Sequence, residues 1–163
     1  MKDKAYRNPS ITKYDFTEED LRSLYTIVNY GARHASEKAE AIWYFNNRIS
    51  YGRFIRDIDA FAAGLVKLGV KKGDFVTIFL PNIPQCVMAV YSINRIGAVC
   101  NLVHPLSTRA ELEHCVKLTD SRFILAFEEA FGRFIFQFRF RHLHFGTLKC
   151  FQIVTQKLHS NRG

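Results

Sequence analysis

The feature that most constrains the fold is a strand–helix–strand pattern over residues 75–103. Residues 75–80 are an apolar run with a single Thr, which is typical of a strand covered on both faces. Residues 84–96 have helical character and are closed by Gly97, and a second apolar run follows at 98–103. Because two parallel strands need a crossover connection of a dozen or so residues, the pattern predicts a βαβ unit.

The pattern continues for one more helix and one more strand. Thr108 and Glu111 stand at the spacing of a capping box, which predicts that a helix begins there. Residues 122–126 are the third predicted strand. Strand, helix, strand, helix, strand is the order of a right-handed, parallel βαβαβ wind. We therefore expect half of a doubly wound sheet.

The chain before this sheet predicts three further elements. Thr17, followed by three acidic residues, indicates a helix N-terminus. Asn46 and Asn47 separate two β-prone runs and tolerate the positive φ of a tight turn, which predicts a hairpin. Residues 53–68 form an amphipathic pattern that Gly69 terminates. The predicted fold class is α/β: a partial doubly wound parallel βαβαβ sheet preceded by a helix, a β-hairpin and a covering helix. The apolar residues that predict the first helix are Leu21, Leu24, Tyr25 and Val28.

The composition changes near Gly132. No acidic residue follows Glu129, whereas this last part of the chain holds six basic residues and seven of the fifteen phenylalanines, so it carries most of the net charge of +8. We predict that residues 1–130 are the N-terminal part of a larger domain. We predict that residues 131–163 are a basic, Phe-rich tail that is non-native or poorly ordered. A reading-frame change or a truncation in the gene explains the change in composition together with the loss of the helix and strand pattern.

The tail also allows a different class of function. From Phe134 to Arg141, phenylalanines alternate with mostly polar and basic residues, so a strand here would suit single-stranded nucleic acid or an anionic membrane. The alternative hypothesis is therefore a non-enzymatic α/β interaction protein, although we favour the non-native tail and expect no specific nucleic acid. The same run is the only remaining β-prone segment that could cap the sheet, and the open edges predict self-association.

Targeting segments and metal sites are not indicated. No apolar run has the length of a membrane span, and residues 1–20 lack the apolar core of a secretory signal, so we expect a cytoplasmic protein. The four cysteines are scattered without a Cys-x-x-Cys pair, which predicts reduced buried thiols rather than zinc ligands or disulfides. They are Cys86, Cys100, Cys115 and Cys150.

Residues 48–125 read RISYGRFIRDIDAFAAGLVKLGVKKGDFVTIFLPNIPQCVMAVYSINRIGAVCNLVHPLSTRAELEHCVKLTDSRFIL. This stretch resembles the N-terminal portion of the AMP-forming acyl-CoA synthetases, which are adenylate-forming ligases, and the resemblance extends over about 21–127. The segment His104-Pro105-Leu106-Ser107 is most similar to the bacterial fatty-acid ligase branch and so implies fatty acid metabolism. The motifs that carry the resemblance are Ser50-Tyr51, Leu-Gly-Val-x-x-Gly-Asp at 68–74, Leu-Pro-Asn at 80–82, Gly-Ala-Val at 97–99 and Glu-Leu at 111–112.

The resemblance implies an enzyme that uses ATP and Mg²⁺ to convert a fatty or other carboxylic acid into acyl-AMP and then transfers the acyl group to CoA. It also implies that residues 1–130 are a fragment of the AMP-binding large domain. The family's Gly-rich phosphate loop, its Tyr-Gly-x-Thr-Glu segment and its C-terminal lysine have no counterpart in this sequence. We therefore expect no catalytic, cofactor-binding or metal-binding residue in this chain, and no activity by the chain alone.

Three residues near strand ends are local candidates for ligand binding. His104 ends a predicted strand at the carboxyl edge, where α/β sheets bind ligands, but a hydrogen-bonded structural histidine is the favoured interpretation. Asn82 and Pro84 are expected to shape the turn from strand to helix rather than to bind a ligand.

Two further pairs are candidates for phosphate binding and for metal binding. Gly73 and Asp74 are interpreted as a turn, because a lone glycine does not form a phosphate cradle. His142 and His144 would share one face of a strand, but no third ligand stands at a suitable spacing, so a metal site is disfavoured.

Overall fold

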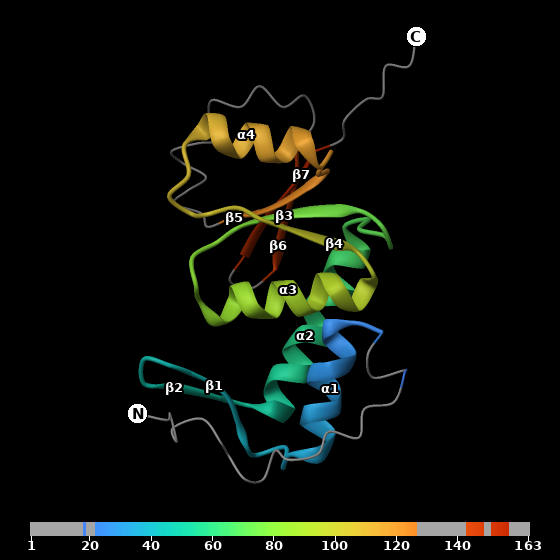
Figure 1. Cartoon of the computed structure of the whole chain (residues 1–163), viewed down its shortest axis with the longest axis vertical. Coiled ribbons are helices and arrows are strands. Elements are labelled where there is room, and N and C mark those ends of the chain that lie inside the picture. The colour runs from blue at the N-terminus through green and yellow to red at the C-terminus, as the bar shows by residue number, and fades with distance from the viewer. Residues whose placement is uncertain (1–17, 19–21, 127–142, 149–150, 157–163) are drawn as a thin grey trace, which may run out of the picture.

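A computed structural model describes residue 18 and residues 22–126, 143–148 and 151–156 of the chain. Figure 1 shows a sheet between two layers of helices, with α4 on one face and α3 on the other; α1 and a hairpin lie on the far side of α3, and α2 runs from the hairpin past α3 to the sheet. The helices are α1 (Leu24–His34), α2 (Tyr51–Lys67), α3 (Pro84–Ile96) and α4 (Arg109–Leu118). None of the helices in the described residues is long and apolar enough to cross a membrane.

The sheet has the strand order β4-β3-β5-β7-β6. Its strands are β3 (Phe75–Phe79), β4 (Val99–Leu102), β5 (Phe123–Ala126), β6 (Leu143–Leu148) and β7 (Phe151–Gln156). β3 pairs in parallel with both β4 and β5, whereas β7 is antiparallel to its neighbours β5 and β6. The predicted α/β fold with three parallel strands is therefore confirmed.

Helices α3 and α4 lie on opposite faces of the sheet because β4 is added on one side of β3 and β5 on the other side. The step from β3 to β4 and the step from β4 past β3 to β5 run in opposite directions, so two right-handed crossovers place α3 and α4 on opposite faces. Two separate buried clusters result. One joins α3 to the sheet through Ala89, Ile93, Ile78 and Leu125. The other joins α4 to the sheet through Leu112, Val116, Ile124 and Ala126.

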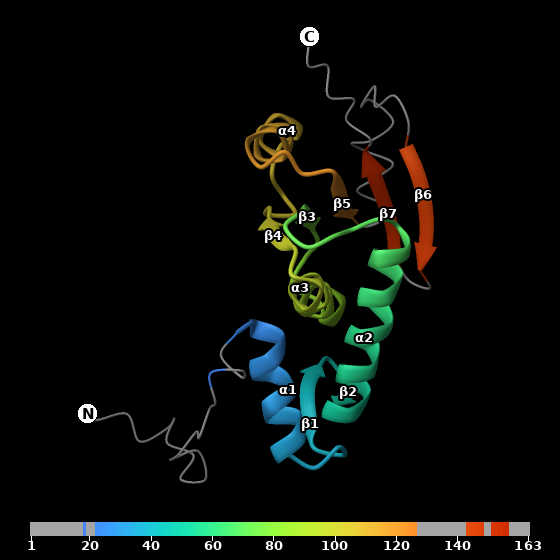
Figure 2. The same cartoon turned by 90° about the vertical axis from the view of Figure 1, so that its right-hand side faces the viewer.

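Helix α2 covers α3 and carries the apolar stripe expected from the sequence. Figure 2 shows α2 running alongside α3 toward the sheet, where its Phe61 and Leu65 join the buried cluster between α3 and the sheet, while α1 packs against α3 below it. Ser50 caps α2 by accepting a hydrogen bond from the Arg53 backbone N–H, and Gly69 follows the helix with φ of 97°. The predicted helix is confirmed, with its start two residues earlier than expected. Its buried residues are Phe54, Ile58, Phe61, Ala62 and Leu65.

Helix α1 begins at Leu24, so the start predicted at Thr17 is wrong. The cap is Ser23, whose side chain accepts a hydrogen bond from the Thr26 backbone N–H, while the Thr26 hydroxyl oxygen accepts one from the Ser23 N–H. This reciprocal pair forms a capping box later in the chain. Thr17 itself and Leu21 lie outside the described residues.

The predicted hairpin is present as β1 (Glu40–Tyr44) and β2 (Asn47–Ser50). Tyr44 pairs with Asn47, so the turn consists of Phe45 and Asn46 rather than the predicted Asn46 and Asn47. Phe45 has the positive φ, at 51°. Ile49 is buried opposite Ile42, and this apolar pair fixes the register from which the turn position follows.

Among the described strands, β4 forms an edge of the sheet, and its Val99 and Leu102 side chains are exposed. One expectation about the sheet is corrected. The strand that caps β5 is β7, so the prediction that Phe134–Arg141 was the only segment able to do this is wrong. Phe134–Arg141 lies outside the described residues, and self-association through open edges stays a prediction.

Candidate functional site

The candidate site is the carboxyl edge of the parallel sheet. In doubly wound sheets, ligands bind outside the carboxyl ends of the strands, where the strand order reverses. Here the order reverses at β3, whose neighbours β4 and β5 both follow it in the chain. The described part of this edge consists of the turn between β3 and α3 and the loop between β4 and α4.

The turn between β3 and α3 is shaped by its own backbone. Ile83 donates its backbone N–H to the Pro81 carbonyl at 2.8 Å and accepts from the Cys86 N–H at 2.9 Å. Pro84 occupies the first turn of α3, where its missing N–H leaves no intrahelical bond unmade. Asn82 is exposed between them. Asn82 and Pro84 thus lie at the turn between β3 and α3, as expected for residues that shape it.

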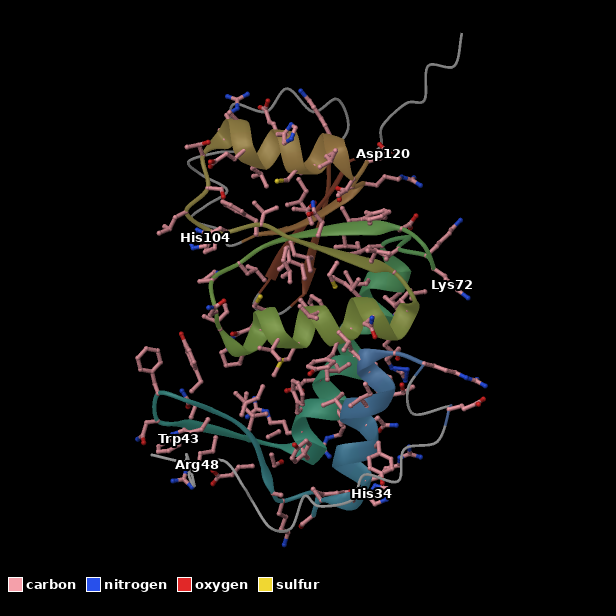
Figure 3. All side chains as sticks on the ribbon, viewed as in Figure 1. His34, Trp43, Arg48, Lys72, His104 and Asp120 are labelled. Carbon is pink, nitrogen blue, oxygen red and sulfur yellow. The ribbon has the colours of Figure 1, made fainter. Side chains whose placement is uncertain are left out.

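The loop between β4 and α4 engages His104 locally. Figure 3 shows His104 beside this loop at the end of the sheet. The Leu106 backbone N–H donates to His104 Nδ1 at 3.2 Å, and the Ser107 N–H donates to the His104 carbonyl at 2.9 Å. Since Nδ1 accepts, the neutral ring carries its proton on Nε2. The exposed ring therefore stabilises its own loop, as the structural interpretation predicted.

Glu111 lies in the first turn of α4, at this edge, and caps that helix. Its Oε2 accepts from the Thr108 backbone N–H at 2.7 Å and from the Thr108 hydroxyl at 3.1 Å. The hydrogen bond from the Thr108 backbone is the main cause that lowers the pKa of the Glu111 carboxyl. Glu111 is therefore a charged cap at pH 7 rather than a candidate general acid.

Gly73 and Asp74 lie at the opposite, amino end of β3. Gly73 adopts φ of 85° and donates its N–H to the Gly97 carbonyl at 2.9 Å, and Asp74 Oδ2 accepts from the Lys71 N–H at 2.8 Å. This N–H is not available to a phosphate, which agrees with the predicted turn.

A metal site finds no support in the described residues. Within them, no group of three or more His, Cys, Asp or Glu residues could hold a metal ion. His142 lies outside the described residues, and so does the side chain of His144. The expectation that this chain holds no catalytic, cofactor or metal residue stays a prediction.

A polar network beneath α4 was not predicted from the sequence. Asn101 Nδ2 donates to the Thr77 hydroxyl at 3.0 Å and to the Thr119 hydroxyl at 3.1 Å, and it also lies 3.3 Å from the Cys115 carbonyl. Thr77 is fully buried. These bonds tie β3 and β4 to the C-terminal end of α4. The available signal was a polar residue within each of two apolar strands.

The cysteines Cys86 and Cys100 lie between α3 and the sheet, both partly buried and free. Burial raises the pKa of the Cys86 thiol. Burial, with a smaller contribution from Cys86, raises the pKa of the Cys100 thiol to about 11. The Cys100 Sγ–H also donates to the Val90 carbonyl at 3.7 Å. Both groups are thus protonated and unreactive near neutral pH, as expected for structural thiols.

Comparison with known proteins places this geometry in a family. The family model described as AMP-binding enzyme matches residues 30–151. Acetyl-coenzyme A synthetase 1 of Candida albicans is 30% identical over 130 residues, which cover 77% of this chain and 19% of that protein. Acetyl-coenzyme A synthetase 1 of Debaryomyces hansenii is 29% identical over 141 residues, with 76% and 21% covered. The chain therefore spans about a fifth of the length of these curated relatives.

Solved structures share the fold. The anthranilate CoA ligase AuaEII in complex with anthranoyl-AMP superposes with a TM-score of 0.66 at 17% identity, covering 72% of this chain and 22% of that one. The N-terminal subdomain of Klebsiella oxytoca NpsA in complex with 3-hydroxybenzoyl-AMSN gives a TM-score of 0.60 at 20% identity, covering 63% and 26%. The resemblance to a fatty-acid branch is not confirmed, since the curated relatives named above are acetyl-CoA synthetases. The parallel sheet, its two helical layers and the match across most of the chain show that this protein belongs to the AMP-binding enzyme family of adenylate-forming ligases.

Proposed function

We propose that this chain serves as the N-terminal part of an AMP-forming acyl-CoA synthetase. In the complete enzyme, ATP would activate a carboxylate as acyl-AMP with release of pyrophosphate, and the CoA thiol would then take the acyl group. The observation that carries the proposal is that the family match, residues 30–151, contains the whole α/β layer from β3 to β5.

The proposed role of this layer is to support the site rather than to perform the chemistry. At the carboxyl edge, His104 is bonded within its own loop and Glu111 within a helix cap. The N–H of Gly73 is bonded to Gly97 at the other end of β3. The described residues thus form no set of groups that fits ATP, Mg²⁺ or CoA, and we propose that the chain alone does not turn over.

The acid proposed for the complete enzyme is acetate or another short acid. The named acetyl-CoA synthetase relatives favour it. The fatty-acyl alternative rests on His104-Pro105-Leu106-Ser107, and these residues form an exposed loop at the edge strand whose histidine is bonded to Leu106. A loop stabilised in this way does not by itself specify a long acyl chain.

The first experiment tests the purified chain for ATP–pyrophosphate exchange with acetate and with a long-chain fatty acid. We expect no exchange above a heat-denatured control with either acid. Exchange that survives stringent purification and co-elutes with the chain would contradict the proposed inactivity.

The second experiment tests the proposed reaction and the proposed acid together. The coding DNA beyond codon 126 is read in all three frames for a Gly-rich Ser/Thr loop and a Tyr-Gly-x-Thr-Glu segment. If a frame contains both, the chain joined in that frame is expected to catalyse exchange with acetate in preference to a long-chain acid. Preference for the long-chain acid would restore the fatty-acyl alternative, and no activity with any acid would overturn the proposal.

A further inference from the structure

We draw no further inference here: the strongest candidate, the edge that β4 forms among the described strands, with Val99 and Leu102 exposed, is an unpartnered sheet edge, and nothing in the structure shows what covers it.

Discussion

The parallel sheet and the α1–hairpin unit are held together by different interactions. In the sheet, Ile78 of β3 and Leu125 of β5 have no solvent exposure and are packed beneath α3. Helix α1 has no buried residue, although its Tyr25 and Val28 pack against a small cluster around Ile58. The sheet is therefore stabilised mainly by apolar burial, whereas α1 has a smaller apolar contact.

Polar contacts hold α1 where apolar burial does not. The Tyr25 hydroxyl donates to Asp59 Oδ1 at 3.0 Å, and Arg95 Nε donates to the same oxygen at 2.7 Å. The Arg95 guanidinium also lies 4.8 Å from the centroid of the Tyr25 ring. Because Asp59 and Arg95 are each more than a third exposed, solvent screens this ion pair and limits its contribution to stability. The comparison teaches that the sheet determines the stability of the fold, and that the peripheral unit tolerates exposed and strained side chains.

The largest expected effect is that of a cavity in the sheet. Ile78→Ala should lower the free energy of unfolding by about 2–5 kcal/mol, because a fully buried side chain loses its contacts. Leu24→Ala, at a side chain of α1 that is 52% exposed, should change it by less than about 0.5 kcal/mol. Urea unfolding followed by circular dichroism measures both variants. Equal losses would show that the two regions do not differ as described.

Thiol reactivity tests how well the sheet is buried at Cys100, which lies between α3 and the sheet. With its pKa raised to about 11, Cys100 should be alkylated at about pH 8 roughly a hundredfold more slowly in the folded chain than in the urea-unfolded chain. Its rate should rise steeply with pH up to that pKa. Peptide mapping by mass spectrometry follows Cys100 separately from the other cysteines. Similar rates in the folded and unfolded chain would mean that α3 does not cover this thiol.

The Tyr25 contact predicts a moderate effect with a defined pH dependence. Burial is the main cause that raises the pKa of Tyr25 above its ordinary value of 10.0, and the hydrogen bond and charge of Asp59 raise it further. The folded state thus favours the neutral phenol, so this contribution is complete below about pH 10 and is lost as the pH rises through the raised pKa. Tyr25→Phe should cost about 1 kcal/mol at neutral pH.

Unfolding measured from about pH 8 to pH 11 tests this assignment. The stability of the original chain should fall more steeply above about pH 10 than that of Tyr25→Phe, whose phenyl ring does not titrate. Parallel profiles for the two proteins would show that another group causes the loss.

The smallest expected effect is a gain in the free energy of unfolding rather than a loss. Phe45→Asn should raise the free energy of unfolding by about 0.5 kcal/mol, because asparagine tolerates the left-handed backbone of this position better than phenylalanine does. Thermal unfolding measures the change, and Asn46→Ala, at the neighbouring turn position without a positive φ, is the control. A destabilised Phe45→Asn variant would show that the contact between Phe45 and Tyr44 outweighs the backbone strain.

Local signals predicted the fold best where several of them agreed. The helix from Pro84 to Ile96 and the cap formed by Thr108 and Glu111 were predicted correctly, because proline, glycine and the capping box mark helix ends through their own chemistry. The hairpin turn was misplaced by one residue, because the pairing of Ile42 with Ile49 outweighs the preference of asparagine for turns. The predicted start of the first helix was too early in the chain, because two capping signals, at Thr17 and at Ser23, compete in that segment.

Long-range pairing and the site were less accessible from the sequence. Strand β7 has no strong alternation, and its pairing with β5 is a tertiary choice that local pattern does not encode. The turn at Gly73 and Asp74 was predicted correctly, whereas the hydrogen bonds that join Thr77, Asn101 and Thr119 were not predicted. Such networks depend on which elements become neighbours, which is decided by the topology of the whole sheet.

The position of β3 between the two other parallel strands has a consequence for synthesis of the chain. Both of its partners are made later: Phe75 pairs with Val99, and Val76 pairs with Phe123. A nascent chain therefore leaves the ribosome with β3 unpaired, and one edge stays open until β5 has followed. The strand that holds the other two parallel strands together in the finished protein is thus the one that stays unpaired longest during translation. Pauses before codon 126 should be the moments at which a nascent chain most needs a chaperone.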